Sequence, residues 1–427
     1  MRVLMVSWEY PPVVVGGLGR HVHQLAEALA GQGVDVTVLT RRPLGTDPAS
    51  HPTTDTVVNG VRVIAVAEDP PEFDFGADMM AWTLAMGHGL VREGLRLLRG
   101  GSDPWEPEVV HAHDWLVAHP SIALADFFDV PLVATLHATE AGRHSGWVAG
   151  QVNRQVHSVE WWLANTADAL ITCSTSMRAE VSELFFPGDG ATPITVIHNG
   201  IDLTAWEFAE RPPAHGPAEL LFAGRLEYEK GVQDLLAALP EIRRTHPGTT
   251  LTIAGEGTQL DWLTGLVDEH ELAEAVTFAG RQDHDGLTTL MHRCAAIVLP
   301  SRYEPFGIVA LEAAASGIPL VTSTAGGLGE AVDHGETGST FPPADVAALT
   351  AAVARTLDDP EAAAVRARRA RAVLTEDFTW PVVAERTAAV YALATRRDRR
   401  PLARPHIPQR PLPHRDPNNP IQDDSAG

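Results

Sequence analysis

The sequence predicts an α/β protein built from two doubly wound parallel sheets. Three observations support this fold class. The length of 427 residues exceeds what one hydrophobic core usually fills. Short apolar runs alternate with amphipathic stretches, and that alternation restarts after a Pro- and Gly-containing segment at 211–217, a predicted linker. Because such sheets bind ligands at the carboxyl ends of their strands, two sheets facing each other predict a ligand site in an interdomain crevice.

The first half contains seven short runs rich in Val, Ile and Leu, which we expect to be buried strands. They are 2–7, 34–40, 61–67, 109–113, 132–137, 169–174 and 194–198. Between the first two runs, a predicted helix at 18–30 places Leu18, Val22, Leu25 and Leu29 on one face. Strands that alternate with helices in this way imply a parallel sheet.

The second half repeats the pattern. Strands are expected at 219–224, 250–254, 276–279, 297–300 and 320–322, with an Ala-rich helix at 305–316 and helical pattern over 345–394. From 396 to 427 the chain is rich in Pro and Arg and has no periodicity, so it is predicted to be a disordered tail. The predicted domains are 1–210 and 211–377, with a last helix at 378–395.

Composition excludes several classes of protein. The formal charge of −23 argues against a general nucleic-acid binder, which would carry a basic stripe. The apolar runs are shorter than the roughly 20 residues of a membrane span, so no stable membrane insertion is expected. The first residues enter a strand at once and have no signal-peptide cleavage site. With only Cys173 and Cys294 and no disulfide or metal pattern, a cytoplasmic protein is the simplest expectation.

The segment 304–312 carries two carboxylates eight residues apart. Glu304 precedes Pro305 and is expected in a loop, whereas Glu312 lies about two helical turns further on, roughly 9–12 Å deeper. That offset suits a sugar joined to a diphosphate, with Glu304 near the hexose and Glu312 near the ribose. A surface role for Glu312 is less attractive because its helical neighbours are apolar. Backbone N–H donors between the two carboxylates would come from Phe306, Gly307 and Ile308.

Two cations stand at the end of the predicted strand 219–224. The planar fork of Arg225 and the mobile ammonium of Lys230 suit a diphosphate, because together they can neutralise charge that builds on a leaving group. The alternative is that they pair with Glu227 or Glu229.

Gly16 and Gly17 follow the first predicted strand. Glycines there allow backbone N–H groups to approach a phosphate at a helix N-terminus, although a tight corner would look the same. The pair at 326–327 has the same two interpretations.

Histidines and a carboxylate end two strands of the first half. His111 and His113 alternate onto one face, which resembles half of a metal site, but no third ligand is evident at a suitable spacing. We therefore predict no metal, and expect Asp114 and His137 to project into the crevice and hydrogen-bond a hexose. The following loop could extend that contact through Glu140, Arg143 and His144.

These motifs, in this order, resemble retaining glycosyltransferases of family 4, which have the two-Rossmann-domain (GT-B) architecture. The resemblance covers roughly residues 1–395. The segments 111–115 and 324–328 resemble those of bacterial glycogen synthases, and the whole is similar to actinobacterial α-(1→4)-glucosyltransferases of glycogen and methylglucose lipopolysaccharide synthesis.

The resemblance implies that Arg225 and Lys230 bind the donor diphosphate, with no metal or other cofactor, and that Glu304 contacts the transferred sugar. It implies that His137 and Asp114 hold sugar hydroxyls, and that the helix at 378–395 returns to the first domain. Transfer would retain the anomeric configuration. Glycogen synthases that use ADP-glucose carry a lysine where this chain has Val14, so the donor can be UDP-glucose or ADP-glucose.

The expected function is therefore transfer of glucose from a nucleotide-glucose to an α-(1→4)-glucan or oligosaccharide. One alternative is a family 4 enzyme that acts on a lipid or another sugar acceptor. A second is a sugar-nucleotide epimerase, which shares the architecture, and a third is a non-catalytic sugar-nucleotide sensor. The natural acceptor and the oligomeric state are left open by the sequence.

Overall fold

A computed structural model describes residues 1–43, 51–67, 73–96, 104–144, 146–186, 192–210 and 216–396. The chain divides into two compact units. Unit 1 contains Met1–Gly200 together with the chain from Trp380 onward, and unit 2 is the continuous segment Ile201–Thr379. The first boundary, after Gly200, lies ten residues before the predicted one at 210, and the second, after Thr379, lies two residues after the predicted one at 377. Most of the predicted linker, 211–215, and all but Arg396 of the predicted tail lie outside the described residues.

Unit 1 is built on an eight-stranded sheet in the order β3-β4-β2-β1-β5-β6-β7-β8. All neighbouring strands are parallel except the edge pair β3 and β4. The strands are β1 Arg2–Val6, β2 Asp35–Arg41, β3 Thr54–Val58, β4 Val61–Val66, β5 Val109–His113, β6 Leu132–Leu136, β7 Ala169–Thr172 and β8 Ile194–Val196.

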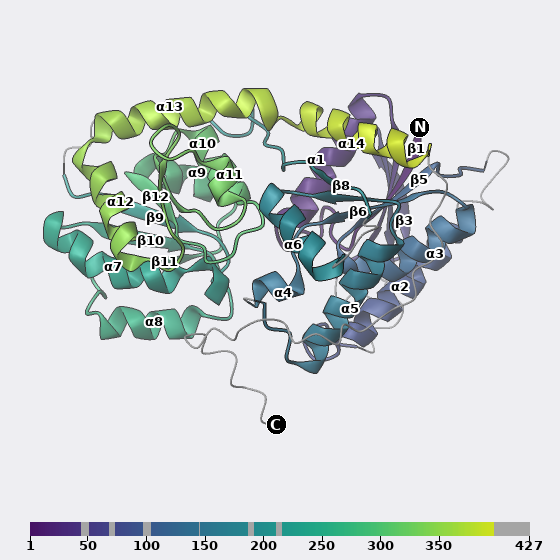
Figure 1. Ribbon diagram of the computed structural model, residues 1–427, viewed down its shortest axis with the longest axis horizontal. Coiled ribbons are helices and arrows are strands. Elements are labelled where there is room, and N and C mark those ends of the chain that lie inside the picture. Colours follow the sequence, from purple (N-terminus) through teal and green to yellow (C-terminus); the bar gives the residue numbers. More distant parts are fainter. Residues whose placement is uncertain are drawn as a thin grey trace. The chain divides into compact units, whose positions relative to one another are not determined.

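Helices cover both faces of this sheet (Figure 1). On one face, α1 (Gly17–Gly31) packs against α14 (Trp380–Ala394), the last helix of the chain. On the other face lie α2 (Met79–Arg96), α3 (Ala118–Phe128) and α5 (Gln151–Thr166). The remaining helices are α4 (Glu140–Arg143), α6 (Thr175–Phe185) and a 3-10 turn, Trp115–Val117. The apolar stripe of α1 is buried, as its spacing predicted.

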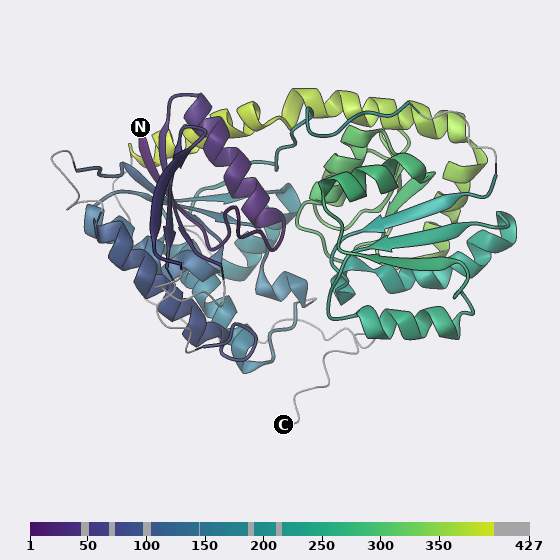
Figure 2. The ribbon, with the colours of Figure 1, turned by 180° about the vertical axis from the view of Figure 1, so that it is seen from behind.

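Unit 2 has a six-stranded parallel sheet in the order β11-β10-β9-β12-β13-β14 (Figure 2). The strands are β9 Glu219–Ala223, β10 Thr250–Ala254, β11 Val276–Gly280, β12 Ala296–Leu299, β13 Leu320–Ser323 and β14 Ser339–Phe341. The helices are α7 Val232–Thr245, α8 Leu260–Glu269, α9 His284–Arg293, α10 Ile308–Ser316, α11 Leu328–Ala331, α12 Val346–Asp358 and α13 Pro360–Asp377, with a 3-10 turn at Tyr228–Lys230.

The predicted α/β class with two parallel sheets is confirmed. The Ala-rich helix begins at Ile308 rather than at 305. The helical pattern predicted over 345–394 is confirmed and consists of three helices, α12, α13 and α14. No element was predicted at the positions of β3, β14 or α2.

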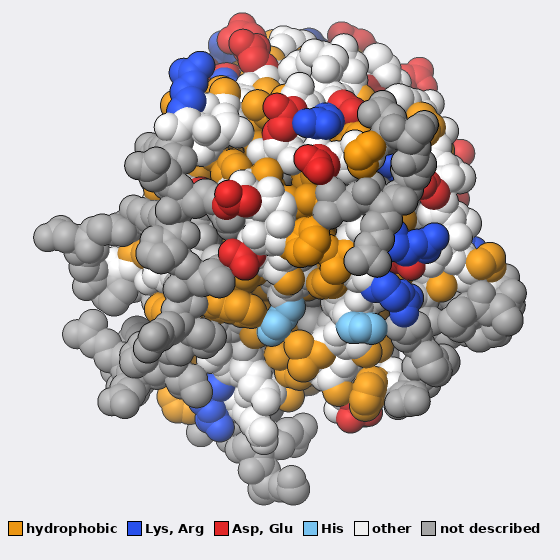
Figure 3. Space-filling model, turned by 90° about the vertical axis from the view of Figure 1, so that its right-hand side faces the viewer, with side chains coloured by type: hydrophobic (Ala, Val, Ile, Leu, Met, Phe, Trp, Pro, Cys, Tyr) orange, Lys and Arg blue, Asp and Glu red, His pale blue; other side chains and the backbone are white. Residues whose placement is uncertain are grey.

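The surface agrees with the acidic composition. On the face drawn in Figure 3, the Lys and Arg side chains of the described residues are scattered among acidic and apolar ones and form no continuous basic patch. Within the described ranges, no helix has the length and apolar character needed to cross a bilayer.

Candidate active site

In unit 2, Lys230 and Glu304 form the centre of the candidate site. Nζ of Lys230 lies 2.7 Å from Oε2 of Glu304, and both side chains are about 85% buried, with 15% and 16% of their surface exposed. Oγ of Ser301 donates a second hydrogen bond to the same carboxylate oxygen at 3.2 Å. A partly buried ammonium and a partly buried carboxylate therefore neutralise each other at the carboxyl end of the sheet, after β9 and β12 have ended.

The backbone brings these two residues together. Lys230 ends the 3-10 turn, and Gly231 follows in the left-handed region with φ of 71°. A Cβ atom at Gly231 would lie 2.0 Å from the carbonyl oxygen of Pro300, so only glycine allows the turn to approach the end of β12 this closely. The carbonyl oxygen of Glu229 accepts hydrogen bonds from the N–H groups of Arg302 and Tyr303, at 2.7 and 3.2 Å.

Arg302, which the sequence analysis missed, connects the same two segments by its side chain. Its guanidinium donates two hydrogen bonds to the buried carboxylate of Asp234, at 2.9 and 2.7 Å. It also lies over the ring of Tyr228, 4.8 Å from the centroid, and donates to the Tyr228 hydroxyl. A bidentate pair of this kind fixes orientation as well as distance, so Arg302 holds the Glu304 loop against the Lys230 turn.

Arg225 is placed differently from Lys230. Its side chain is half exposed, and Nη2 lies 2.9 Å from Oε1 of Glu229. The pairing with Glu229 that the sequence left open is therefore present. Because the guanidinium is half exposed, an incoming anion could reach it without unfolding the turn.

Helix α10 follows Glu304. Gly307 has φ of 94°, and a Cβ atom there would lie 2.5 Å from Cδ2 of Leu328. Phe306 and Glu312 are each 2% exposed, so Glu312 is a buried carboxylate, not a surface residue. The turn at 326–327 is a close packing point, since a Cβ at Gly327 would lie 2.4 Å from Cα of Phe306 and its N–H already donates to the Glu304 carbonyl oxygen.

In unit 1, the side chain of Glu9 is hydrogen-bonded to the loop that leads into α1. Its buried carboxylate accepts hydrogen bonds from the N–H groups of Val15 and Gly16, at 2.7 and 3.0 Å. Gly16 has φ of −148°, an extended conformation, and Gly17 begins α1. The N–H of Gly16, predicted to face a phosphate, is therefore already used by a carboxylate that the sequence analysis did not single out.

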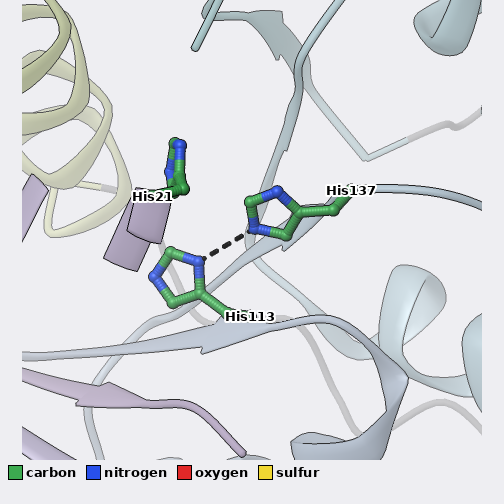
Figure 4. Close-up of side chains that lie close together, drawn as sticks. All are labelled: His21, His113 and His137. Atoms are coloured by element: carbon green, nitrogen blue, oxygen red, sulfur yellow. Dashed lines mark hydrogen bonds between the residues drawn. The ribbon is translucent and has the colours of Figure 1, made fainter. Parts of the chain in front are cut away.

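Three histidines from separate segments meet at the carboxyl end of the unit 1 sheet (Figure 4). His21 comes from α1, His113 ends β5, and His137 follows β6. Nδ1 of His113 and Nε2 of His137 are 3.2 Å apart, and the ring of His21 packs edge-on against His137 with centroids 4.8 Å apart. No third ligand for His111 and His113 was evident from spacing along the chain, whereas the fold brings His21 and His137 next to His113.

His111 is next to this group, and both of its ring nitrogens are hydrogen-bonded. Its Nδ1 is 2.7 Å from the hydroxyl of Tyr391 on α14, and its Nε2 is 2.8 Å from Oγ1 of Thr135. The rings of His111 and His113 are tilted by 43° with their centroids 4.1 Å apart. The last helix of unit 1 is thereby connected to the histidines through one buried hydrogen bond.

Burial keeps these rings neutral. It lowers the pKa of His21, His111 and His113 well below the ordinary histidine value. Burial, with a smaller effect from the charge of Arg143, lowers the pKa of His137 to about 4. A neutral imidazole both donates and accepts a hydrogen bond, which is the combination that a sugar hydroxyl requires.

Asp114 is held in a strained backbone conformation, with φ of 64°. Its buried carboxylate accepts the backbone N–H of His137 at 2.7 Å. Burial raises the pKa of Asp114 to about 6, although that hydrogen bond opposes the rise. Asp114 thus fixes the backbone that carries His137.

The loop after His137 contains further polar groups. Glu140 lies 3.1 Å from Nε2 of His144, and the N–H of Glu140 donates to Glu160 at 2.8 Å. Burial raises the pKa of Glu160 well above its usual range. Arg143 is exposed on this loop.

Sequence reasoning missed Glu9, His21, Asp234, Arg302 and Glu160. Of these, only His21 had a usable signal, since it lies three residues after Leu18 and four before Leu25, on the stripe predicted to be buried. The partners of Asp234, Arg302 and Glu160 are distant in sequence, and those of Glu9 are backbone N–H groups that no side-chain pattern marks.

Comparison with known proteins covers nearly the whole described chain. The family model "Glycosyltransferase Family 4" matches residues 15–205, and "Glycosyl transferases group 1" matches 206–373. A glycogen synthase from Mycobacterium tuberculosis is 64% identical over 97% of this chain and 100% of its own length. A D-inositol 3-phosphate glycosyltransferase from Kineococcus radiotolerans is 31% identical over 92% of this chain and 95% of its own. The solved sucrose-phosphate synthase from Thermosynechococcus elongatus has a TM-score of 0.77 at 26% identity, covering 92% of this chain and 98% of that one.

Proposed function

The chain belongs to the family 4 glycosyltransferases with the GT-B fold, and from that membership we propose that it transfers glucose from a nucleotide-glucose to an α-(1→4)-glucan. The observation that carries the proposal is the 64% identity to a glycogen synthase over 97% of this chain. An epimerase, which needs no acceptor, loses its support because the named relatives are transferases or synthases.

The donor would be bound by groups of unit 2. The diphosphate of the donor competes with Glu304 for Lys230 and with Glu229 for Arg225, because each cation is already held by a carboxylate. Release of Glu304 from Lys230 would leave a carboxylate oxygen able to accept a hydrogen bond from the hexose. Glu312 would bind the ribose, and the N–H groups at Phe306, Gly307 and Ile308 would lie toward the phosphates.

Sugar hydroxyls would be bound by groups of unit 1. A neutral His137 can donate to one sugar hydroxyl and accept from another. Asp114 would act mainly by holding the backbone of His137, since its Oδ1 accepts that N–H. For Gly16 and Gly17, we propose a role in closing the turn into α1 rather than in binding phosphate directly, because Glu9 takes the Gly16 N–H.

Catalysis would consist mainly of stabilising the departing nucleotide. Negative charge develops on the diphosphate as the bond to glucose breaks, and Lys230 and Arg225 are placed to neutralise it. No metal cofactor is then required, and no side-chain nucleophile is needed for a transfer that retains the anomeric configuration. We expect EDTA not to lower turnover.

The test is a product assay with UDP-glucose or ADP-glucose and a maltooligosaccharide of defined length. The expected product is the acceptor lengthened by one α-(1→4)-linked glucose, with release of the nucleoside diphosphate. If both donors are left intact in the presence of this acceptor, the proposed reaction is wrong. The faster of the two donors identifies the nucleotide.

A second candidate is transfer to a small phosphorylated acceptor. It is favoured by the relatives that are named D-inositol 3-phosphate glycosyltransferases, 31% identical over up to 92% of this chain. Arg143, exposed on the loop after His137, would suit an anionic acceptor. The same assay with D-inositol 3-phosphate and a panel of hexose phosphates separates the two. Consumption of donor with a phosphorylated acceptor but not with maltooligosaccharides would select this candidate.

A further inference from the structure

The three histidines of unit 1 have the geometry of a metal site (Figure 4). One ring nitrogen from each of His21, His113 and His137 can be chosen so that all three lie within 4.8 Å of one another. The residues come from three different elements, α1, β5 and the loop after β6. Three imidazoles that converge on one point are the ligand set of several tetrahedral zinc sites that keep a fourth position open.

The spacing is close to what such an ion requires. With metal–nitrogen bonds of about 2.0–2.1 Å, two nitrogens on one tetrahedral ion lie about 3.4 Å apart. The separation between Nδ1 of His113 and Nε2 of His137 is 3.2 Å. The widest separation, up to 4.8 Å, would have to close by roughly 1.4 Å, which small rotations of an imidazole side chain can supply.

The surroundings leave one nitrogen of this group without a partner. Among the described residues, Nδ1 of His21 has no hydrogen-bond partner, although that side chain is 95% buried. A neutral imidazole nitrogen in this state has a lone pair or a proton that no neighbour satisfies. His111 cannot be a fourth ligand without losing Tyr391 or Thr135, since both of its nitrogens are engaged.

Orientation and access are also provided. The ring of His21 packs edge-on against Trp380 with centroids 5.4 Å apart, a contact that limits how far the ring can turn. His137 is only partly buried, so an ion can reach the group from its side, and a water molecule can take the fourth position.

We propose that His21, His113 and His137 bind one transition-metal ion of the zinc class, and that the bound ion inhibits glucosyl transfer. Each ring contributes one nitrogen lone pair, so binding needs no further reactant. Inhibition rests on the proposed function, in which His137 hydrogen-bonds the sugar. A nitrogen of His137 that is bound to metal is withdrawn from that contact. The ion is thus an inhibitor and not the cofactor of the transfer.

Binding is tested without reference to activity. The full-length protein is stripped with EDTA, desalted and titrated with Co²⁺, whose visible absorption bands distinguish tetrahedral from octahedral coordination. We expect tetrahedral bands that saturate at one Co²⁺ per chain and disappear when Zn²⁺ is added. Octahedral bands only, or no saturation at one equivalent, would overturn the site.

Two variants of α1 make a matched pair. His21→Phe keeps a ring against Trp380 but removes the nitrogens, so its Co²⁺ affinity should fall by at least about tenfold. His23→Phe changes a histidine two residues away that pairs with Glu27 and lies outside the group, so its affinity should equal that of wild type. If His21→Phe does not fold, as judged by circular dichroism, His21→Gln replaces it. Equal affinity in the His21 and His23 variants contradicts the proposal.

Inhibition is measured on the same samples. Zn²⁺ should slow donor consumption with the midpoint found in the titration, EDTA should restore the rate, and His21→Phe should need at least about tenfold more Zn²⁺. Metal binding without inhibition of an active enzyme overturns the inhibitory role and the contact proposed for His137. A protein inactive with every donor and acceptor contradicts the proposed function, while the Co²⁺ bands still decide the metal site.

Discussion

Lys230, the cation at the centre of the candidate site in unit 2, is already paired with a carboxylate. Lys230 is held by Glu304 at 2.7 Å while both side chains are mostly buried. Each of the two charges would be unfavourable alone in this position, so each depends on the other or on a ligand. A diphosphate donor can therefore take over Lys230 only if it brings comparable charge and hydrogen bonds.

Replacement of Lys230 tests this dependence. Lys230→Ala should lower turnover by about 10²–10³-fold, because one group that stabilises charge on the leaving nucleotide is lost. The measurement is the rate of nucleoside diphosphate release at saturating acceptor. Arg244→Ala, which breaks an exposed pair with Glu241, is the control and should retain the wild-type rate. A rate near wild type for Lys230→Ala would refute its role.

Arg302 gives a prediction about stability. Arg302→Met leaves the Asp234 carboxylate buried without its guanidinium and should lower the free energy of unfolding by about 3 kcal/mol. Arg293→Met breaks an exposed pair with Glu219 and should cost less than about 1 kcal/mol. Chemical denaturation measures both. The double variant Arg302→Met with Asp234→Leu should recover part of the lost free energy of unfolding. If Arg302→Met costs no more free energy of unfolding than Arg293→Met, Arg302 does not hold the loop.

At the scale of elements, the turn Tyr228–Lys230 depends on the glycine that ends it. Gly231→Ala should lower the free energy of unfolding by more than the roughly 1–2 kcal/mol of left-handed strain, since its Cβ also meets the Pro300 carbonyl oxygen at 2.0 Å. Gly335 offers a matched control with φ of 80° and open space around its Cβ, so Gly335→Ala should show the strain alone. Equal losses in thermal denaturation would mean that the turn does not pack against β12 as described.

Most strands could be predicted because buried parallel strands are continuous apolar runs bounded by turns. The exceptions have physical causes. Strand β3 is largely exposed and antiparallel, so Thr54–Val58 shows no apolar run. Helix α2 contains Gly87, Gly89 and Gly94, and glycines weaken a helical pattern in the sequence. A Cβ atom at Gly94 would lie 2.7 Å from Cδ2 of Leu124, so close packing accounts for the glycine at that position.

The candidate site was predictable where its residues share a short segment. The segment 304–312 shows a loop carboxylate, a glycine and a helix start in order, and the structure places them so. The contact between Lys230 and Glu304 spans 74 residues, and the histidine group joins positions 21, 113 and 137. Such contacts depend on strand order in the sheet, which periodicity along the chain does not give.

Unit 2 is a single continuous segment of the chain, whereas unit 1 is made of two segments. Unit 2 is one segment whose ends meet, since the N–H of Ile201 donates to the carbonyl oxygen of Phe378 at 2.7 Å. Unit 1 is completed only by α14, whose Val383, Val390 and Tyr391 are buried. Burial of three such side chains contributes roughly 5–9 kcal/mol, comparable to the stability of an entire domain.

We therefore expect the two units to differ in whether they fold when each is produced as a separate fragment. The fragment 201–379 should fold alone and melt cooperatively, whereas 1–200 should not, because it lacks α14. Thermal denaturation followed by circular dichroism measures both. As a control, 1–200 joined by a flexible linker to 380–396 should regain a cooperative transition. A cooperative melt of 1–200 by itself would show that the last helix is dispensable for unit 1.

The chain has 32 basic side chains of Arg and Lys, and Lys230 is the only lysine among them. Apart from the N-terminal α-amine, its Nζ is therefore the single primary amine of the protein. Reductive methylation with ¹³C-formaldehyde would place one isotopic reporter on the ammonium that faces Glu304. Its NMR resonance, alongside the one from the N-terminal amine, would follow the loss of that carboxylate partner when a nucleotide sugar arrives, with no mutation.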